Sequence, residues 1–477
     1  MRRLWHWIRP YRRTFWASAL LLPVTTALML VQPWILKDAI DRYAERGDAA
    51  GLARSAGFFL LAAAGELAAL YLQYWLTMIV AQQSLADLRL DLFRHVQRLP
   101  QSYFDRNPVG RIVTRLTTDV DVLNEMFATG SMTIFMDGLT TAGIVAVMLW
   151  IDWRLALVTL SVVPLLLVAI DFFRRRARVT YRNIRERVAR INSFLQEAIS
   201  GMSVIQLFAH EHASLDEFVS HNAAHRDAYH LSNVYEALLF SIVEMTASIS
   251  MAAVAWWASG RIGAGVVAFG TLVAFIEYIQ RFFVPIRDFS AKYAVLQSAM
   301  TAGERIFQLL DTPVSIESPP DARVPDQAAP GRGSVEFDDA WFAYKREDFV
   351  LRDVTLRVAP GEKVAIVGAT GSGKTTLTKL LNRSHDASRG TVRVSGLDVR
   401  DWDLEALRRE VGVVLQDSFL FTGTIGDNVF PHGRPGPDEV ARVLRAANVD
   451  GLVASLPAGL DERIGERCAN LSSGHPH

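Results

Sequence analysis

A glycine-rich stretch from Glu362 to Leu381 has the residue types and the spacing needed to bind a triphosphate. Gly368 and Gly373 enclose four residues and are followed by Lys374 and Thr375, which fits the phosphate-loop pattern Gly-x4-Gly-Lys-Ser/Thr. Glycines let successive backbone amides turn toward the phosphates, and a following helix adds the positive end of its dipole. The lysine supplies a mobile positive charge, and the threonine hydroxyl is a suitable Mg²⁺ ligand. We therefore expect this stretch to bind ATP and Mg²⁺.

The surrounding sequence favours this interpretation over an ordinary glycine-rich turn. An apolar, β-branched run at 364–367 precedes the glycines and a helix-period segment follows them, which predicts the strand, loop and helix that a phosphate loop requires. An ordinary turn would need neither the lysine nor the hydroxyl. The candidate nucleotide-contacting residues of this stretch are Gly368, Gly371, Ser372, Gly373, Lys374, Thr375 and Thr376.

Two more candidate site residues stand at the ends of predicted strands. Tyr344 follows the strand predicted over 335–342, and an aromatic ring there could stack on adenine, although such a ring is more often part of a core. Gln416 ends the apolar run 411–415, which we expect to be a buried strand. Because the carboxyl end of a central strand borders the ligand crevice, Gln416 is a candidate to contact Mg²⁺ or the attacking water.

The composition indicates a membrane protein with a soluble part. The chain has 477 residues, half of them hydrophobic, which is high for a soluble protein. Its formal net charge is zero, so a general attraction to nucleic acid is not indicated. The single cysteine, Cys468, excludes an intrachain disulfide framework, and no histidine or aspartate pattern marks it as a nucleophile.

Six apolar segments are each near the ~20 residues needed to cross about 30 Å of hydrocarbon. They cover residues 14–37, 55–80, 131–151, 154–172, 236–258 and 262–284. The alternative, buried helices of a large soluble protein, is disfavoured by charge placement. The connections after the second and fourth segments are long and arginine-rich, so the positive-inside rule places them and both termini in the cytoplasm.

The segments that flank and join the spans carry their own signals. Residues 1–13 mix arginines with aromatic rings, which is typical of an uncleaved segment at the membrane interface. The two long connections are periodic and polar, and we expect helices that leave the membrane, turn and return. We place one turn at 101–110, where Pro108 and Gly110 interrupt the helix period, and the other at 211–216, near Ser214.

Four acidic residues lie inside the expected spans: Glu66, Asp137, Glu244 and Glu277. No basic residue is expected in mid-span to neutralise them, and a carboxylate that faces lipid is costly. Two interpretations remain open at this point. The carboxylates could line a cavity that accepts cationic amphipathic molecules, or they could be protonated or hydrogen-bonded between helices.

The chain divides into three parts by composition. Residues 1–310 form the expected transmembrane domain, 311–333 are rich in Pro, Asp, Ala and Gly and read as a linker, and 334–477 form the nucleotide-binding domain.

Near the C-terminus, Leu471, Ser472, Ser473 and Gly474 follow the phosphate loop and the strand that ends in Gln416. This run resembles the signature motif of ABC transporters. Six spans ahead of such a domain resemble an exporter half-transporter of the multidrug and lipid type. The residues 103–111 and 465–467 are also similar to that family's first coupling region and to its loop before the signature.

The resemblance implies a fold and a set of roles. The fold is an all-α six-helix transmembrane bundle with long cytoplasmic extensions, followed by an α/β P-loop domain that is incomplete at its C-terminal end. Tyr344 would stack on adenine and Gln416 would contact Mg²⁺. Leu471, Ser472, Ser473 and Gly474 would cap ATP held by a second half-transporter.

The sequence departs from the family at its end. His475 stands where the family has Gln, Pro476 opposes the following helix, and Cys468 stands where these exporters carry Gly. The second Mg²⁺-binding Asp, the catalytic Glu and the switch His do not appear, so no catalytic residue is assigned. We expect slow or no ATP hydrolysis by this polypeptide alone and a marginally stable nucleotide domain, and we read the last three residues as a frameshift tail or the end of a fragment.

Three functions remain open. The first is the ATP-binding and permease subunit of an exporter in a bacterial inner membrane, which moves amphipathic small molecules or lipids together with a second half-transporter. The second is a hydrolysis-deficient subunit that acts only through its partner. The third is a channel or receptor built on the same fold. The abundance of arginine over lysine hints at a bacterial source.

Overall fold

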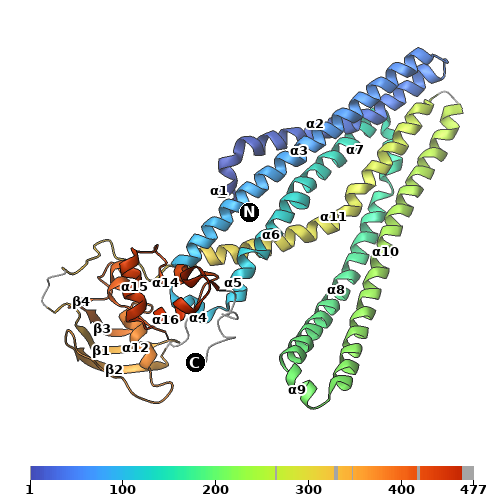
Figure 1. Ribbon diagram of the computed structural model, residues 1–477. Helices are drawn as coiled ribbons and strands as arrows, with labels where there is room; N and C mark the ends of the chain where they lie inside the picture. Colours follow the sequence, from blue (N-terminus) through green and yellow to red (C-terminus); the bar gives the residue numbers. More distant parts are fainter. Residues whose placement is uncertain (1, 264–265, 327–330, 346, 416–418, 465–477) are drawn as a thin grey trace. The chain divides into compact units, whose positions relative to one another are not determined.

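Long helices make up most of the chain up to Leu310, and the β-sheets follow it (Figure 1). The computed structural model describes residues 2–263, 266–326, 331–345, 347–415 and 419–464. The chain divides into two compact units, Met1–Leu99 with Tyr103–Val314 and Pro100–Ser102 with Ser315–His477.

Up to Leu310 the α-helices are α1 (Trp5–Ile8), α2 (Arg12–Ala39), α3 (Ala49–Arg98), α4 (Gln101–Arg106), α5 (Val109–Leu116), α6 (Thr118–Glu125), α7 (Ser131–Leu160), α8 (Val163–Ser200), α9 (Met202–Leu207), α10 (Glu211–Gly263) and α11 (Phe269–Leu310). Two π-helical segments, Ile40–Ala44 and Met126–Gly130, follow α2 and α6. With 50 residues, α3 is about 75 Å long at 1.5 Å per residue. It therefore extends well beyond a bilayer, as the sequence predicts.

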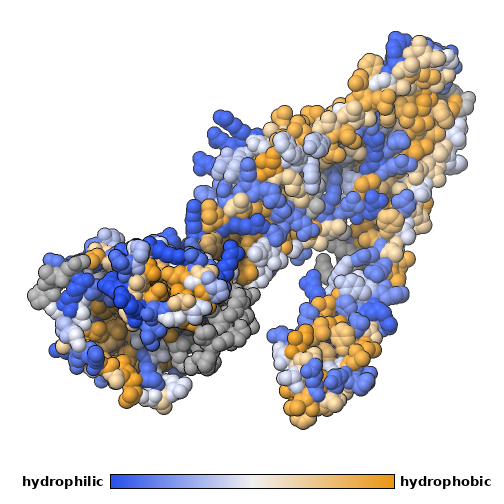
Figure 2. Space-filling model, viewed as in Figure 1, coloured by the Kyte–Doolittle hydropathy of each residue, from blue (hydrophilic) through white to orange (hydrophobic). Residues whose placement is uncertain are grey.

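Among the described residues, five helical stretches are long and apolar enough to cross a membrane. They are Trp5–Ala44, Ala49–Arg98, Val109–Leu160, Glu211–Ile262 and Phe269–Leu310. Only 6% of the most apolar part of α3 is buried, and Figure 2 shows apolar side chains over the surface of α2 and α3. Such an exposed apolar surface needs lipid around it.

The fourth expected span, 154–172, is not one continuous helix. Asp152 interrupts α7 with an extended backbone (φ −155°, ψ 104°), and its carboxylate accepts the N–H of Arg154 at 2.9 Å. A turn at 161–162 then ends α7, and α8 starts with a proline in its first turn. The apolar part of α8, Val163–Phe173, is shorter than the other candidate spans, because the turn divides the apolar segment between the end of α7 and the start of α8.

The second connection turns earlier than the sequence predicts. The turn lies at 208–210, and the expected region 211–216 forms the first turns of α10. Ala209 has a left-handed backbone (φ 51°). The N–H of Ala209 donates to Gln206 O at 3.2 Å, and the N–H of His210 donates to Ile205 O at 2.9 Å. This is the Schellman pattern that ends helices, and an alanine in the glycine position concealed it.

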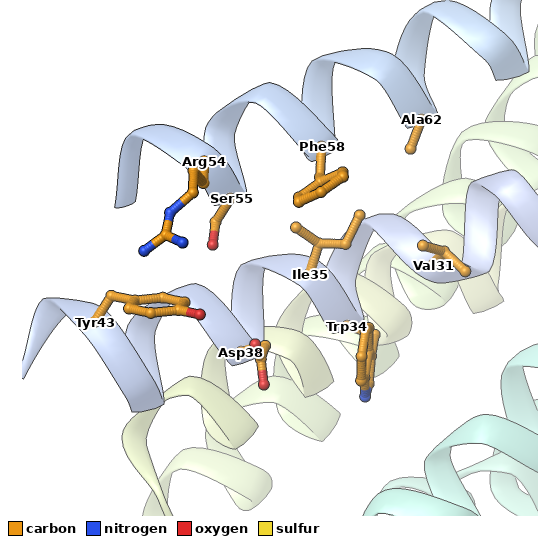
Figure 3. Close-up of a pocket in the computed structure, with 9 residues that line it drawn as sticks. All are labelled: Val31, Trp34, Ile35, Asp38, Tyr43, Arg54, Ser55, Phe58 and Ala62. Carbon is orange, nitrogen blue, oxygen red and sulfur yellow. The ribbon is translucent and has the colours of Figure 1, made fainter. Parts of the chain in front are cut away.

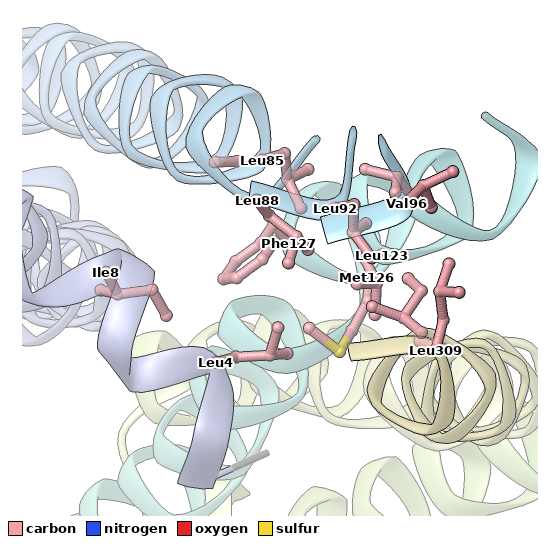
Figure 4. Close-up of a cluster of buried hydrophobic side chains, with 14 of the residues drawn as sticks. Leu4, Ile8, Leu85, Leu88, Leu92, Val96, Leu123, Met126, Phe127 and Leu309 are labelled. Atoms are coloured by element: carbon pink, nitrogen blue, oxygen red, sulfur yellow. The ribbon is translucent and has the colours of Figure 1, made fainter. Parts of the chain in front are cut away.

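The N-terminal segment packs against the helices rather than lying apart from them. Leu4 and Ile8 are buried in an apolar cluster with α3, α6 and α11 (Figure 4). Trp7 donates from Nε1 to Asp91 at 2.9 Å, and Tyr11 donates its hydroxyl to Asp87 at 2.9 Å. These contacts give the aromatic rings a packing role that the sequence did not indicate.

An ion pair with a buried carboxylate lies beside the same cluster. Asp119 of α6 is 2% exposed, and Arg305 of α11 binds it with both Nε, at 2.9 Å, and a second guanidinium nitrogen. Because a buried carboxylate without its partner is strongly unfavourable, the pair fixes α6 against α11.

The expectation that no basic residue would neutralise the acidic residues in the spans is wrong for two of them. Lys292 pairs with Asp137 at 2.5 Å, and Arg281 lies 3.9 Å from Glu277. Glu66 accepts a hydrogen bond from Gln32. Arg281 lies on α11 four residues after Glu277, whereas Lys292 of α11 reaches Asp137 on α7.

A proline explains why α11 contacts the backbone of α2. Pro33 lies inside α2, and a proline has no N–H to give to the carbonyl four residues earlier. That carbonyl, of Met29, instead accepts a hydrogen bond from Arg281 at 2.6 Å. The hydroxyl of Tyr278, a fully buried residue, donates to Leu30 O at 2.6 Å. The two bonds join α2 to α11.

The second unit contains two antiparallel sheets and short helices. The four-stranded sheet has the order β2-β1-β3-β4, and the two-stranded sheet pairs β5 with β6. The strands are β1 (Val335–Ala343), β2 (Phe349–Val358), β3 (Arg389–Val394), β4 (Leu397–Asp398), β5 (Gly423–Thr424) and β6 (Arg463–Ile464). The helices are α12 (Lys374–Leu381), α13 (Leu404–Glu410), α14 (Ile425–Val429), α15 (Pro437–Ala446) and α16 (Asp450–Ser455). An apolar core lies between the larger sheet, α12 and α13.

The runs 364–367 and 411–415, which the sequence predicts as strands, are not strands in the structure. Val367 is 88% exposed and Val414 is 98% exposed. A strand needs a neighbour for its backbone hydrogen bonds, and none of the described residues supplies one for either run. The phosphate loop is therefore followed by its helix but is not preceded by a paired strand.

An ion pair joins the two ends of the helical unit and provides a pH test. Arg3 donates two hydrogen bonds of 2.7 Å to Asp311, and its guanidinium lies 4.4 Å from the Phe307 ring centroid. The hydrogen bond from Arg3 lowers the pKa of Asp311 below its usual value. The contribution of the pair is therefore present at neutral pH and is lost as the pH falls through the lowered pKa of Asp311.

We predict that Asp311→Asn removes this pH dependence. In the unsubstituted protein, hydrogen-exchange protection of Trp5–Ile8, corrected for intrinsic exchange, falls on acidification. In D311N it is already low at neutral pH and changes little. Glu45→Gln, at the α2–α3 turn, is the control and keeps the original pH profile. Equal protection of the two proteins at neutral pH would contradict the assignment.

Candidate nucleotide-binding site

Two glycines give the loop ahead of α12 its shape. Gly371 (φ 86°) and Gly373 (φ 92°) both have left-handed backbones, which residues with a side chain rarely adopt. Gly373 is also packed closely, because a Cβ there would lie 2.6 Å from Cδ2 of Leu351 in β2. The position just before α12 therefore requires glycine for both backbone and packing reasons.

The start of the loop folds toward Ser372. A Cβ on Gly368 would lie 2.7 Å from the Oγ of Ser372, and the amide of Ser372 donates to Ala369 O at 3.2 Å. The residues 361–372 are exposed, so the backbone amides of the loop are accessible to a ligand.

Lys374 bends back over the loop. Its Nζ donates hydrogen bonds of 2.8 Å to the carbonyls of Gly368 and Ala369. The ammonium is thus held at the edge of the loop by two neutral acceptors. A phosphate oxygen, which carries negative charge, is a stronger acceptor for an ammonium than a carbonyl.

The first amides of α12 fit an anion. In the described part of the chain, the N–H groups of Gly373, Lys374 and Thr375 have no hydrogen-bond acceptor. Such orphan donors at a helix N-terminus, together with the helix dipole, form an anion site. This observation supports the fit of the loop to a phosphate group.

The two threonines after the lysine differ in their surroundings. Thr375 is exposed, whereas Thr376 is 4% exposed and its hydroxyl lies 3.2 Å from the Tyr344 hydroxyl. Thr375 is therefore the hydroxyl that remains accessible to a metal ion, and Thr376 links the helix to Tyr344.

The structure brings Tyr344 to the loop but also engages its ring. The ring packs edge-on against Phe342 and His385, with centroids 4.8 and 5.4 Å away. Lys379 Nζ lies 5.3 Å from the ring centroid, within cation–π range. The tyrosine is held in place from several directions, and its proposed stacking on adenine stays a prediction.

Lys379 and His385 were not identified from the sequence. His385 is 5% exposed and lies between two aromatic rings of the core, and no pattern around it marks that position. A signal for Lys379 was present, because Thr376 and Lys379 are three residues apart on one helix and so share a face.

Five sequence-predicted site residues lie outside the described residues. They are Gln416, the expected second Mg²⁺ ligand, and Leu471, Ser472, Ser473 and Gly474 of the signature-like run. The described site therefore consists of the phosphate loop, the start of α12 and Tyr344.

Comparison with known families gives two matches along the chain. Residues 15–286 match the family model described as the ABC transporter transmembrane region. Residues 351–476 match the model described as ABC transporter. The two matches follow one another in the order of the helical region and the phosphate loop.

Curated bacterial proteins are similar over nearly the whole chain. The "Putative multidrug export ATP-binding/permease protein YgaD" of Bacillus subtilis is 31% identical over 99% of this chain and 83% of its own length. The "ATP-dependent lipid A-core flippase" of Desulfotalea psychrophila is 28% identical over 99% of this chain and 82% of its own length. The "Fatty acid ABC transporter ATP-binding/permease protein" of Mycobacterium tuberculosis is 34% identical over 85% of this chain and 64% of its own length.

The glycine before α12 gives a direct test of the loop. Gly373→Ala forces a side chain into a left-handed backbone, at a cost of about 1–2 kcal/mol, and against Leu351, which adds roughly 1–3 kcal/mol of overpacking. Gly361→Ala is the matched control, because Gly361 has φ 76° but nothing within 4 Å of an added Cβ. Hydrogen exchange of the α12 peptide measures the local opening free energy, which we expect to fall more in G373A than in G361A. An equal fall in both variants would show that the Leu351 contact does not matter.

Proposed function

Because this chain belongs to the ABC transporter family, we propose that it is the ATP-binding and permease subunit of an exporter, which couples ATP binding and hydrolysis to the export of amphipathic small molecules or lipids. The observation that carries the proposal is the loop at Gly368–Thr375, whose orphan amides and lysine suit a phosphate. It follows, in one chain, a helical region with several apolar helices.

We assign the parts of the chain accordingly. Residues 1–310 form the transmembrane domain, 311–333 the linker and 334–477 the nucleotide-binding domain. ATP binds the loop, with Thr375 and Gln416 as Mg²⁺ ligands and Tyr344 against the adenine. The signature-like residues 471–474 cap ATP held by a second half-transporter. Mg²⁺-ATP, when bound, supplies the phosphoanhydride whose binding and cleavage drive transport.

The lysine of the loop and the first amides of α12 bind the phosphates. Lys374 leaves the carbonyls of Gly368 and Ala369 and donates to phosphate oxygens instead. The amides of Gly373 and Thr375 donate from the helix N-terminus. Nucleotide binding shifts the transporter between its states only as far as the nucleotide prefers one state over the other.

The contacts of the acidic residues bear on the substrate class. Asp137 and Glu277 each have a cation from α11, and Glu66 has a hydrogen-bond donor. Glu244 alone is exposed and has no partner among the described residues. This arrangement favours neutral or anionic amphiphiles, such as lipids and fatty acids, over cationic drugs as substrates.

The turn between α8 and α10 supports a partner. Ile199, Leu207 and Phe208 are 67%, 79% and 73% exposed. The arginine-rich helices that lead to this turn support a position in water on the cytoplasmic side. An apolar patch in water suits an interaction site. We propose that a nucleotide-binding domain of the paired assembly covers it, in a bacterial inner membrane with both termini cytoplasmic.

A second candidate function is a subunit that binds nucleotide but depends on its partner for turnover. The exposed, unpaired runs 364–367 and 411–415 flank the site in sequence. In the described residues they lack the neighbours that would hold a catalytic group rigidly in place. Co-expression with an intact half-transporter separates the two candidates, because only the second needs the partner's site for ATP turnover.

The nucleotide site is tested by photolabelling of the full chain in membrane vesicles. A photoreactive ATP analogue labels the region around Lys374 in the unsubstituted protein. Lys374→Ala lowers the labelling at least about tenfold, since the lysine contributes a charge-assisted bond of roughly 1.5–3 kcal/mol. Lys363→Ala, an exposed lysine just before the loop, is the control and retains labelling. No specific labelling of the unsubstituted chain in a membrane-embedded pair would refute the proposal.

The apolar turn is tested by matched charge substitutions. Leu207→Asp places a charge in the patch, and Gln206→Asp places the same charge on the neighbouring exposed residue. In inverted vesicles from the native host, we expect L207D to reduce ATP-driven uptake of a fluorescent phospholipid at least about fivefold, because burying an unpaired carboxylate at an interface costs several kcal/mol. Q206D keeps most of the activity, and ATP photolabelling is unchanged in both. Equal losses in the two variants would contradict an apolar docking surface.

A further inference from the structure

A cavity of about 430 Å³ lies between α2 and α3, close to the turn that joins them (Figure 3). It is lined by Val31, Trp34, Ile35, Asp38, Tyr43, Arg54, Ser55, Phe58 and Ala62. Its size falls within the usual range for small-molecule sites. It lies in the helical unit, away from the phosphate loop in the sequence.

The lining separates into a polar end and an apolar end. Figure 3 shows Arg54, Ser55 and Tyr43 at the end near the turn, with Phe58 and Ile35 facing one another further along. On α2, the lining runs from Val31 to Asp38, about 10 Å at 1.5 Å per residue. The cavity is therefore amphipathic along the helix axis.

The polar end carries both signs of charge. Asp38 pairs with Arg42 at 2.8 Å and keeps 26% of its side chain exposed. Arg54 uses Nε for a long contact of 3.3 Å to Ala50 O. In the described part of the molecule, its two terminal nitrogens have no acceptor. This end thus offers donors to an anion and a carboxylate to a cation.

A backbone irregularity builds the end wall. The helix changes to π geometry over Ile40–Ala44, a feature often found at functional sites. The ring of Tyr43 then lies so close to Gly51 that a Cβ there would be 2.1 Å from its Cδ1. The tyrosine reaches this position because α3 has no side chain at Gly51.

The cavity lies at the depth where apolar sequence gives way to charge. Lys37, Asp38, Asp41 and Arg42 end the apolar run of α2, so the polar end is level with lipid headgroups. Phe58 is 64% exposed and Trp34 is 39% exposed, so the apolar end opens toward the hydrocarbon.

We propose that this cavity binds a phospholipid with a zwitterionic, amine-bearing headgroup, in the leaflet at the α2–α3 turn. The phosphate lies against Arg54, the ammonium against Asp38, and an acyl chain runs between Ile35 and Phe58. This lipid is a bound component and not the transported substrate, so the site goes beyond the proposed function.

The test uses the full chain in nanodiscs of phosphatidylethanolamine that carries a photoreactive acyl chain, with cross-links mapped by mass spectrometry. Cross-links concentrate on the peptides that contain Val31–Asp38 and Arg54–Ala62. Arg54→Gln lowers them at least about fivefold, and Ser55→Trp, which fills the cavity, abolishes them. Arg46→Gln, a charge in the same turn that does not line the cavity, leaves them unchanged.

A second arm tests the headgroup and the source of the phosphate. The unsubstituted protein is labelled more strongly by phosphatidylethanolamine than by phosphatidylglycerol, and Asp38→Asn removes the difference. Added inorganic phosphate does not compete. Photolabelling by the ATP analogue confirms that each variant is folded. If S55W does not fold, R54Q alone tests the site.

Two results would overturn the proposal. The first is labelling of the cavity no denser than labelling of Leu67 and Tyr71, which are exposed positions of α3 outside the cavity lining and outside the Arg54–Ala62 peptide. The second is labelling that R54Q leaves intact. Equal labelling by the two lipids in the unsubstituted protein would overturn the zwitterionic assignment.

Discussion

Backbone hydrogen-bonding groups that have no water must find another partner, and this constraint governs the helical unit. Long helices satisfy it internally, residue by residue. Where Pro33 breaks the series, the carbonyl of Met29 accepts a bond from Arg281 of α11. The carbonyl that Pro33 leaves free thus becomes the acceptor of a bond that helps to fix α2 against α11.

In the nucleotide-binding unit, where water is accessible, backbone hydrogen-bonding groups can remain without a protein partner. The orphan amides at the start of α12 do not need a protein partner, and they remain available to a ligand. The lysine beside them is held by two carbonyls rather than by a carboxylate. A neutral pair of acceptors is easily exchanged for phosphate, whereas a carboxylate would compete with it.

Local chemistry was predictable from the sequence and distant pairing was not. The glycines, the lysine and the helix of the loop follow from spacing within eight residues, Gly368 to Thr375. Lys292 of α11, the partner of Asp137, is 155 residues away in the sequence, so no local pattern predicts that contact. Arg281, in contrast, lies only four residues after Glu277 on the same helix, which is a local signal present in the sequence. The runs 364–367 and 411–415 have strand composition, but a strand exists only with a neighbour. The turn at 208–210 was misplaced because Ala209 occupies a position where glycine is the usual signal.

The contact between Arg3 and Asp311 joins residues 308 positions apart. The first residues of the helical unit therefore lie beside the end of α11. A group fused to the N-terminus would therefore lie close to Asp311, at the end of α11. An affinity tag or fluorescent protein fused there would disturb the ion pair between Arg3 and Asp311 and the contact of the Arg3 guanidinium with the Phe307 ring. Reporter groups are better placed in the α2–α3 turn, whose residues Glu45–Gly47 are exposed and far along α3 from that contact.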